Sequence, residues 1–232
     1  YLKLSKKLQH HKNILSVDVP SGIYTDTGNM ANSYIRARET ITFTHPKICH
    51  FLGDGYANSG KLYTYPIGHV EDFNNDINIR LIEKSDINSL IKSKNKNSNK
   101  YSGKKVISFC GSKKYTGALL LSNASAMKAG VKILRKIIPS SLKQLSFQHY
   151  ESIDISIEDN DKGYLGLKQY DKITKELSWS EILLIGPGLD EGKDSIFLTS
   201  KILNSYTGLC IIDASAFLPI INEDLKIEDI PE

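Results

Sequence analysis

The sequence predicts an α/β protein whose parallel sheets are covered by helices. Short apolar strands alternate with helical patterns along much of the chain, and most of the strands end in a glycine-containing turn or at an aspartate. With 232 residues, 40% of them hydrophobic and 24% charged, the chain is long enough for one or two domains with real cores.

The first part of the chain predicts a helix, three strands and a second helix. Apolar spacing indicates the first helix, and its change to a shorter period indicates the strands, the first of them buried. Ser85 is expected to cap the second helix, with Asp86 in its first turn. The helices are expected at residues 2–8 and 81–91, and the strands at residues 14–19, 40–44 and 61–67.

The polar run at residues 92–100 has almost no apolar side chains and predicts a solvated linker. Beyond it, strands and helices alternate again, which is typical of β-α-β units. Strands are expected at residues 106–109, 182–185 and 209–212, and helices at residues 118–137 and 195–203.

Ligands of open α/β sheets bind beyond the carboxyl ends of the strands. This rule selects four places in the sequence. They are Asp18 with the turn Pro20-Ser21-Gly22, the segment from Gly111 to Ala118, the turn Gly186-Pro187-Gly188, and Asp213.

The two aspartates each allow two interpretations. A carboxylate in an apolar strand is costly unless it is paired or functional, and partial desolvation would raise the pKa of Asp18, as suits a general acid or base. Alternatively, Asp18 accepts hydrogen bonds from the turn amides of Ser21 and Gly22. Asp213 closes its strand either as a capping or turn residue or as a ligand contact.

The glycine turns could hold an anion or a carboxamide on the amides of a helix N-terminus. The Gly111–Gly117 segment is not a Walker loop, because its glycines are six apart and no Lys-Ser/Thr follows. Gly186, Gly188 and Gly192 miss the dinucleotide fingerprint by one residue. Tight strand-to-helix turns need glycine in any case.

Composition argues against several classes of protein. The net charge is only +4 with acids and bases both abundant, whereas a nucleic-acid binder would more often show a basic face. No apolar run is long enough for a membrane span. Three widely spaced cysteines suit a reducing cytosol. We therefore expect a cytoplasmic protein without nucleic-acid or membrane partners. Because Tyr1 begins inside a helix, we also expect a piece of a longer chain.

Ordered motifs in the first part resemble the closing half of NAD(P)H-hydrate epimerase. They are Ser16-Val17-Asp18-Val19-Pro20-Ser21-Gly22-Ile23, Asp26-Thr27-Gly28, Thr40-Ile41-Thr42-Phe43 with Pro46-Lys47, and Phe51-Leu52-Gly53-Asp54-Gly55. The second part resembles the start of the ADP-dependent NAD(P)H-hydrate dehydratase. Its motifs are Cys110-Gly111-Ser112, Tyr115-Thr116-Gly117-Ala118, Ile185-Gly186-Pro187-Gly188-Leu189 and Ile212-Asp213-Ala214.

The resemblance implies a bifunctional repair enzyme cut at both ends. Residues 1–80 would be the last part of a Rossmann-like, three-layer epimerase domain, and residues 81–100 a helix and linker. Residues 101–232 would begin a ribokinase-like αβα dehydratase domain. The family's Asn-Asn-Gly-Gly loop would precede Tyr1, and its Gly-Thr-Gly-Asp anion hole would follow Glu232. Ser215 and Leu218 depart from the family's aspartate and asparagine.

The implied activities are epimerisation of NAD(P)H hydrate at C6 and nucleotide-dependent dehydration of the S epimer. Asp18 would bind the hydrate and act as acid or base, and Ser21 would help to hold a potassium ion. ADP or ATP with magnesium would serve the dehydratase, and the complete protein would be a homo-oligomer. The dehydratase substrate contacts would be Tyr115, Thr116, Gly117, Ala118, Gly186, Gly188 and Asp213.

Two other functions compete with this one. A ribokinase-family small-molecule kinase would need no epimerase module, and the Asp18 motif therefore argues against it. A non-catalytic, epimerase-like binding protein is disfavoured by the dehydratase motifs that follow.

Overall fold

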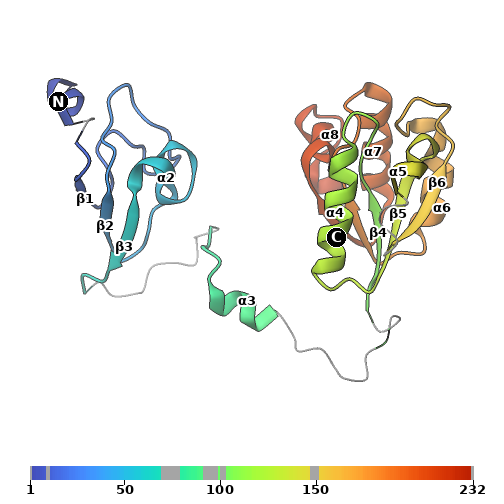
Figure 1. Ribbon diagram of the computed structural model, residues 1–232, viewed down its shortest axis with the longest axis horizontal. Coiled ribbons are helices and arrows are strands. Elements are labelled where there is room, and N and C mark those ends of the chain that lie inside the picture. Colours follow the sequence, from blue (N-terminus) through green and yellow to red (C-terminus); the bar gives the residue numbers. More distant parts are fainter. Residues whose placement is uncertain are drawn as a thin grey trace. The chain divides into compact units, whose positions relative to one another are not determined.

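A computed structural model of the chain describes residues 2–8, 11–68, 79–90, 99, 103–146 and 152–230. The chain divides into two compact units, Tyr1–Ile87 and Asn88–Glu232. Each unit contains its own parallel sheet (Figure 1), which confirms the predicted α/β class. Among the helices of the described ranges, none is both long and apolar enough to cross a bilayer.

The first unit is built on a three-stranded sheet in the order β1-β2-β3, with both strand pairs parallel. The central strand is the best buried, and its Thr40 and Thr42 have no exposed surface. The elements are α1 (Leu2–Leu8), β1 (Leu15–Val17), β2 (Glu39–Phe43), the 3₁₀ helix η1 (Ile48–His50), α2 (Gly53–Ser59), β3 (Lys61–Tyr65) and α3 (Lys84–Leu90).

The strand expected at residues 14–19 is shorter and more exposed than predicted. β1 covers only Leu15–Val17, and the Leu15 and Val17 side chains are 56% and 64% exposed. β1 lies at the edge of this sheet, and alternate side chains face opposite sides, so that only Ser16 points into the unit. Asp18 therefore follows the strand and does not lie within it.

The second unit contains a five-stranded parallel sheet in the order β6-β5-β4-β7-β8. Its strands are β4 (Lys105–Phe109), β5 (Ile133–Pro139), β6 (Ile153–Ile157), β7 (Ile182–Ile185) and β8 (Leu209–Ile212). Its α-helices are α4 (Thr116–Lys128), α5 (Lys143–Ser146), α6 (Tyr170–Leu177), α7 (Lys193–Ser205) and α8 (Leu218–Ile221). Short 3₁₀ helices include η2 (Ser140–Leu142) and η4 (Ala214–Phe217).

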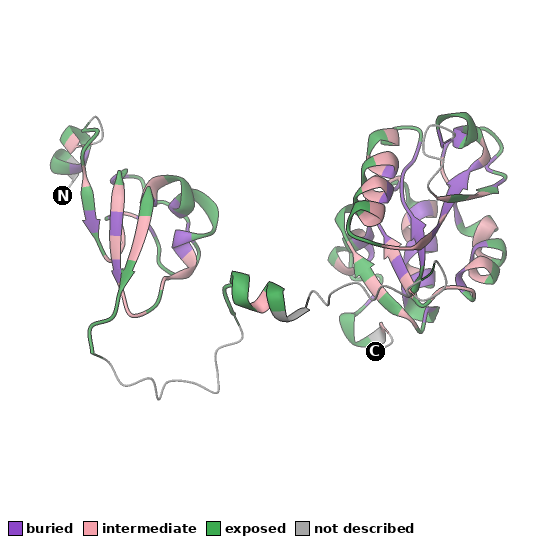
Figure 2. Ribbon diagram, turned by 60° about the horizontal axis from the view of Figure 1, so that its bottom comes forward, coloured by how far each residue is buried: buried purple, intermediate pink, exposed green. Residues whose placement is uncertain are grey.

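Helices cover both faces of this sheet. On one face, Ile173 of α6 and Leu198 of α7 belong to the same buried cluster as Ile107. On the other face, Leu119 of α4 packs with Cys110 and Ile138. Adjacent residues of one strand point to opposite faces, so these two clusters form the two halves of an αβα sandwich. The buried sheet between exposed helix surfaces is visible in Figure 2. The three-layer arrangement of the first unit stays a prediction.

The expected helix at residues 118–137 is wrong in its second half. α4 ends at Lys128, Gly130 adopts a φ of 104°, and β5 begins at Ile133. Gly130 ends the helix because this backbone conformation is left-handed. The isoleucines that follow fit either apolar period, but β5 lies between β4 and β6, where a fully buried strand is needed.

Most other elements occur close to their predicted places, with ends shifted by up to three residues. The helices α2, α5, α6 and α8 and the strand β6 were not predicted. Asp86 lies in the first turn of α3 as expected, and its carboxylate accepts a hydrogen bond from the Glu83 amide at 2.8 Å. The predicted linker at residues 92–100 lies outside the described residues, apart from Asn99.

A buried carboxylate fixes the loop that follows β6. Asp159 is 1% exposed and accepts four hydrogen bonds. Its donors are Ser140 Oγ at 2.8 Å, Ser141 N at 3.1 Å, Ser141 Oγ at 2.7 Å and Gly163 N at 2.6 Å. Burial raises the pKa of Asp159, but these hydrogen bonds outweigh it and leave the pKa below its ordinary value.

We expect Asp159→Asn to lower the free energy of unfolding by about 3 kcal/mol, because one of the two backbone donors would then face an amide NH₂. Asp161→Asn, at an exposed position in the same loop, is the matched control. The stabilisation by Asp159 is complete above the ordinary pKa near 3.8 and is lost as the pH falls through the lowered value. Urea unfolding at pH 7 and pH 3 measures both effects, and equal stability of the two variants at pH 7 would contradict the expectation.

Candidate functional site

The sheet of the first unit places polar side chains of β1 and β2 at one edge. The Asp18 amide donates to Ile41 O at 2.7 Å, which continues the parallel pairing one residue past β1. Thr42, next along β2, therefore lies beside Asp18. Its hydroxyl donates to Asp18 Oδ1 at 2.9 Å.

Lys47 completes this cluster. Its ammonium donates to Asp18 Oδ1, to Thr42 Oγ1 at 2.8 Å and to Phe43 O at 3.3 Å. The Lys47 side chain is 26% exposed and that of Asp18 is 44% exposed. The site is therefore a half-buried ion pair that keeps one carboxylate face accessible.

The expectation of a raised pKa for Asp18 is wrong. Partial burial does raise it, but the hydrogen bonds from Lys47 and Thr42 and the Lys47 charge prevail, so that the pKa of Asp18 lies below its ordinary value. The carboxylate bonds to these two side chains rather than to the turn amides. Asp18 is thus ionised at neutral pH, as a proton acceptor requires.

The turn after Asp18 is held by its backbone. Ser21 O accepts a hydrogen bond from the Ile35 amide at 2.8 Å, while the Ser21 side chain is exposed. Gly22 has a φ of 88°, and a Cβ there would lie 2.2 Å from Ser33 O. Only glycine fits this position. The role of Ser21 as a metal ligand stays a prediction.

In the second unit, the order of strands reverses between β4 and β7. From β4 the chain moves outward to β5 and β6, and it then crosses back to β7 and β8 on the other side of β4. Helices that follow β4 and β7 consequently lie on opposite faces, which opens a crevice beyond the carboxyl ends of these two strands. Gly111 and Gly186 follow these two strand ends directly or within two residues.

The two glycine turns are joined by main-chain hydrogen bonds. The Gly111 amide donates to Pro187 O at 2.8 Å, and the Gly186 amide donates to Phe109 O at 3.2 Å. Gly188 adopts a φ of 71°, and a Cβ there would lie 2.6 Å from Ala118 Cβ. The predicted residues Tyr115, Ala118, Gly186 and Gly188 therefore meet at one place.

The amino end of α4 faces this junction. Thr116 and Gly117 form its first turn, and in the described part of the chain no side chain caps the helix. Nearby, the Ser112 hydroxyl is 1% exposed and lacks a hydrogen-bond partner among the described residues. A buried polar group in this state costs about 1–3 kcal/mol. A polar group of a ligand would satisfy both features.

Asp213 lies at the neighbouring strand end. Its amide donates to Ile185 O at 3.1 Å. Its carbonyl oxygen lies so close to Gly186 that a Cβ on Gly186 would be 1.7 Å from it. It holds the N-cap position of η4, but its exposed side chain makes no capping hydrogen bond. Burial, with a smaller contribution from the Asp213 carboxylate, raises the pKa of the Cys110 thiol to about 12. That thiol remains protonated at neutral pH.

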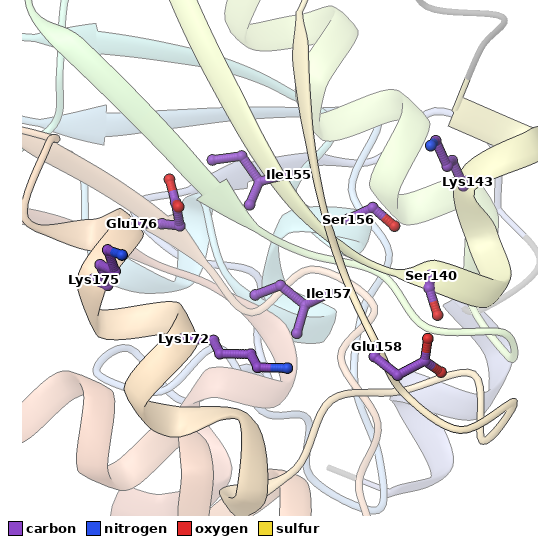
Figure 3. Close-up of a pocket in the computed structure, with 9 residues that line it drawn as sticks. All are labelled: Ser140, Lys143, Ile155, Ser156, Ile157, Glu158, Lys172, Lys175 and Glu176. Carbon is purple, nitrogen blue, oxygen red and sulfur yellow. The ribbon is translucent and has the colours of Figure 1, made fainter.

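A separate cleft of about 590 Å³ lies beside the outer strand β6 (Figure 3). It contains none of the residues predicted from the sequence. Its floor is formed by Ile155 and Ile157, and lysines and glutamates surround it. The lining residues are Ser140, Lys143, Ile155, Ser156, Ile157, Glu158, Lys172, Lys175 and Glu176.

Sequence reasoning missed Lys47, Thr42 and His50 as members of the Asp18 site. The motif Pro46-Lys47 marked this position in the sequence. No residue pattern indicated that the Lys47 side chain reaches back to Asp18. It also missed Gly163, whose carbonyl accepts the Lys113 amide at 2.7 Å. Through Gly163, the loop held by Asp159 supports the turn that carries Ser112.

Two family models match this chain. Residues 106–228 match the NAD(P)H-hydrate dehydratase model, and residues 1–49 match the YjeF-related protein N-terminus.

Curated relatives match nearly the whole chain. A bifunctional NAD(P)H-hydrate repair enzyme of Dictyoglomus turgidum is 29% identical over 94% of this chain and 44% of its own length. One of Moorella thermoacetica is 27% identical over 89% and 39%, respectively. The chain thus spans about two fifths of their length. A solved ribokinase-like superfamily protein of Enterococcus faecalis is 19% identical, with a TM-score of 0.48 over 59% of this chain and 46% of that one.

We expect Gly188→Ala to destabilise the second unit by about 2 kcal/mol, because the new methyl group meets Ala118 and Tyr115 in a left-handed conformation. Gly117→Ala is the matched control, since a Cβ there has nothing within 4 Å. We expect that variant to be as stable as the parent or slightly more so. Thermal unfolding compares the two, and similar melting temperatures would argue against close packing of the two turns.

Proposed function

Because this chain belongs to the NAD(P)H-hydrate dehydratase family and begins with a YjeF-related segment, we propose that its protein repairs hydrated NAD(P)H in two steps. The first unit takes part in interconverting the two C6 epimers. The second takes part in dehydrating the S epimer back to NAD(P)H. The two family matches carry this proposal, and the meeting of Gly111, Gly188 and the amino end of α4 at the reversal of strand order supports its second step.

For epimerisation, Asp18 is the proposed proton acceptor. The C6 hydroxyl of the hydrate sits beside the ring nitrogen, so loss of its proton allows the C6–N1 bond to open to an aldehyde. The Lys47 ammonium, which contacts Asp18, is the proposed proton donor to N1. Closing the ring on the other face of the carbonyl returns both protons and inverts C6. Asp18 is ionised at neutral pH, as a proton acceptor must be, although its lowered pKa makes it a weaker base than an ordinary aspartate.

For dehydration, we propose that the glycine turns bind the hydrated nicotinamide. Gly186 and Gly188 allow close approach to the backbone, and Thr116 and Gly117 offer amides of α4 to the ligand. Tyr115, 37% exposed, and Ala118 form the wall, and Asp213 lies at the next strand end. ADP or ATP with magnesium supplies the phosphoryl group that turns the hydroxyl into a leaving group.

We also propose a potassium ligand, a cellular compartment and an oligomeric state for the protein. The exposed Ser21 hydroxyl offers an oxygen ligand, which suits a potassium ion. We further propose a cytoplasmic homo-oligomer that needs neither nucleic acid nor membrane. The three cysteines are free thiols, which agrees with a reducing compartment.

The test of this function is recovery of reduced-nicotinamide absorbance from mixed hydrate epimers. The complete natural protein, with ADP or ATP and magnesium, should convert the whole mixture. If recovery stops once the S epimer is consumed and the R epimer remains, the epimerase activity is rejected. No recovery with either nucleotide would reject the dehydratase.

In the complete protein, we expect Asp18→Asn to slow epimerisation by about 10² to 10⁴-fold, because the proton acceptor is lost. Dehydration of the S epimer should be unchanged. Glu39→Gln is a matched control, since Glu39 begins β2 of the same sheet and pairs only loosely with Arg38 at 3.8 Å. Chromatographic separation of the R and S epimers gives the rate. Equal loss of both activities in Asp18→Asn would contradict the separation of the two sites.

A further inference from the structure

His50 is buried directly behind the Asp18–Lys47 pair. It ends η1 and is 3% exposed. Its Nδ1 is 3.0 Å from the Lys47 amide nitrogen, and its Nε2 is 3.0 Å from Asp18 O. Both ring nitrogens thus bond to main-chain atoms of the two residues whose side chains form the ion pair.

The partners define the protonation of this ring. A backbone amide can only donate, so Nδ1 is the bare acceptor. A carbonyl can only accept, so Nε2 carries the proton and donates to Asp18. His50 is therefore the neutral Nε2–H tautomer. A protonated ring would direct a second N–H at the Lys47 amide.

Asp18 needs such support because its backbone is strained. Its φ is 66°, in the left-handed region that residues with a side chain rarely adopt. Two hydrogen bonds restrain its main chain, from its own amide to Ile41 O and from His50 Nε2 to its carbonyl. The conformation directs the carboxylate to Thr42 and Lys47.

We propose that His50 is a positioning residue for epimerisation, which ties the main chains of Asp18 and Lys47 together and so keeps the proton acceptor and donor in place. This inference rests on the proposed epimerase activity. Because His50 is buried and its ring nitrogens bond to main-chain atoms of Asp18 and Lys47, it would act through these two residues and not by contact with the substrate.

The neutral ring also predicts a pH dependence. The charged groups that face His50 are Asp18 and Lys47. Burial lowers the pKa of His50, and the Lys47 charge lowers it further, while the carbonyl and carboxylate of Asp18 oppose this. Both hydrogen bonds of the neutral His50 ring are present above the ordinary pKa of about 6.5. The bond from the Lys47 amide is lost when the ring is protonated, as the pH falls through the lowered pKa. Asp18 itself titrates below this range.

The test uses three variants of the complete protein. His50→Leu removes both hydrogen bonds, His50→Gln can keep the donor to Asp18 O, and His50→Asn can keep the acceptor for the Lys47 amide. For each, kcat and KM of epimerisation are measured beside dehydration of the S epimer in the same sample. Dehydration reports on folding of the second unit, and thermal unfolding reports on the first.

We expect His50→Leu to lower the kcat of epimerisation about 10- to 100-fold with a smaller change in KM, since small displacements of catalytic groups have effects of this size. His50→Gln and His50→Asn should retain more activity than His50→Leu. The acid limb of the kcat profile, expected below the ordinary histidine pKa of about 6.5, should disappear in His50→Gln. Dehydration should be unchanged throughout.

An epimerisation kcat of His50→Leu equal to that of the wild type would overturn the proposal. So would an unchanged acid limb in His50→Gln. If His50→Leu does not fold, the acid limb of His50→Gln decides the question. A wild-type protein without epimerisation would instead reject the proposed function itself.

Discussion

The hydrogen bond from the Gly111 amide to Pro187 O, 2.8 Å long, couples the two turns on which the second unit's candidate site depends. Parallel pairing brings the carboxyl ends of β4 and β7 to one edge, and the reversal of strand order between them leaves that edge open. The backbone can close the junction only because Gly188 leaves room for Ala118 and Tyr115. The result is a surface of amides and small residues, which suits a flat, polar ring.

The first unit uses the same edge of a parallel sheet in a different way. There the groups proposed to face the ligand are side chains, held by Thr42 and Lys47 and, behind them, by His50. A paired carboxylate with one accessible face suits proton transfer, whereas an amide-lined turn suits binding. This division of chemistry supports the proposal of two successive reactions on one damaged nucleotide.

Local patterns predicted the turns well, because a glycine or an aspartate at a strand end is a feature of neighbouring residues. Contacts between distant residues were not predictable in this way. Lys47 lies 29 residues beyond Asp18 in the sequence. Its contact with the Asp18 carboxylate helps to lower the pKa of that group, which burial alone would raise. β5 was taken for helix because its isoleucines fit both apolar periods, and only its place between β4 and β6 distinguishes them. Asp159 carried no motif, although it anchors the loop that supports Lys113.

Hydrogen–deuterium exchange of the complete protein, with and without NADPH hydrate, tests most directly where the ligand binds. The amides of residues 111–118, Gly186, Gly188 and Leu189 should gain protection on binding, because they belong to the joined turns. The segments 140–143 and 172–176, which contribute Ser140, Lys143, Lys172, Lys175 and Glu176 to the cleft at β6, should exchange at unchanged rates. Protection confined to the β6 cleft, with none at the glycine turns, would contradict the account.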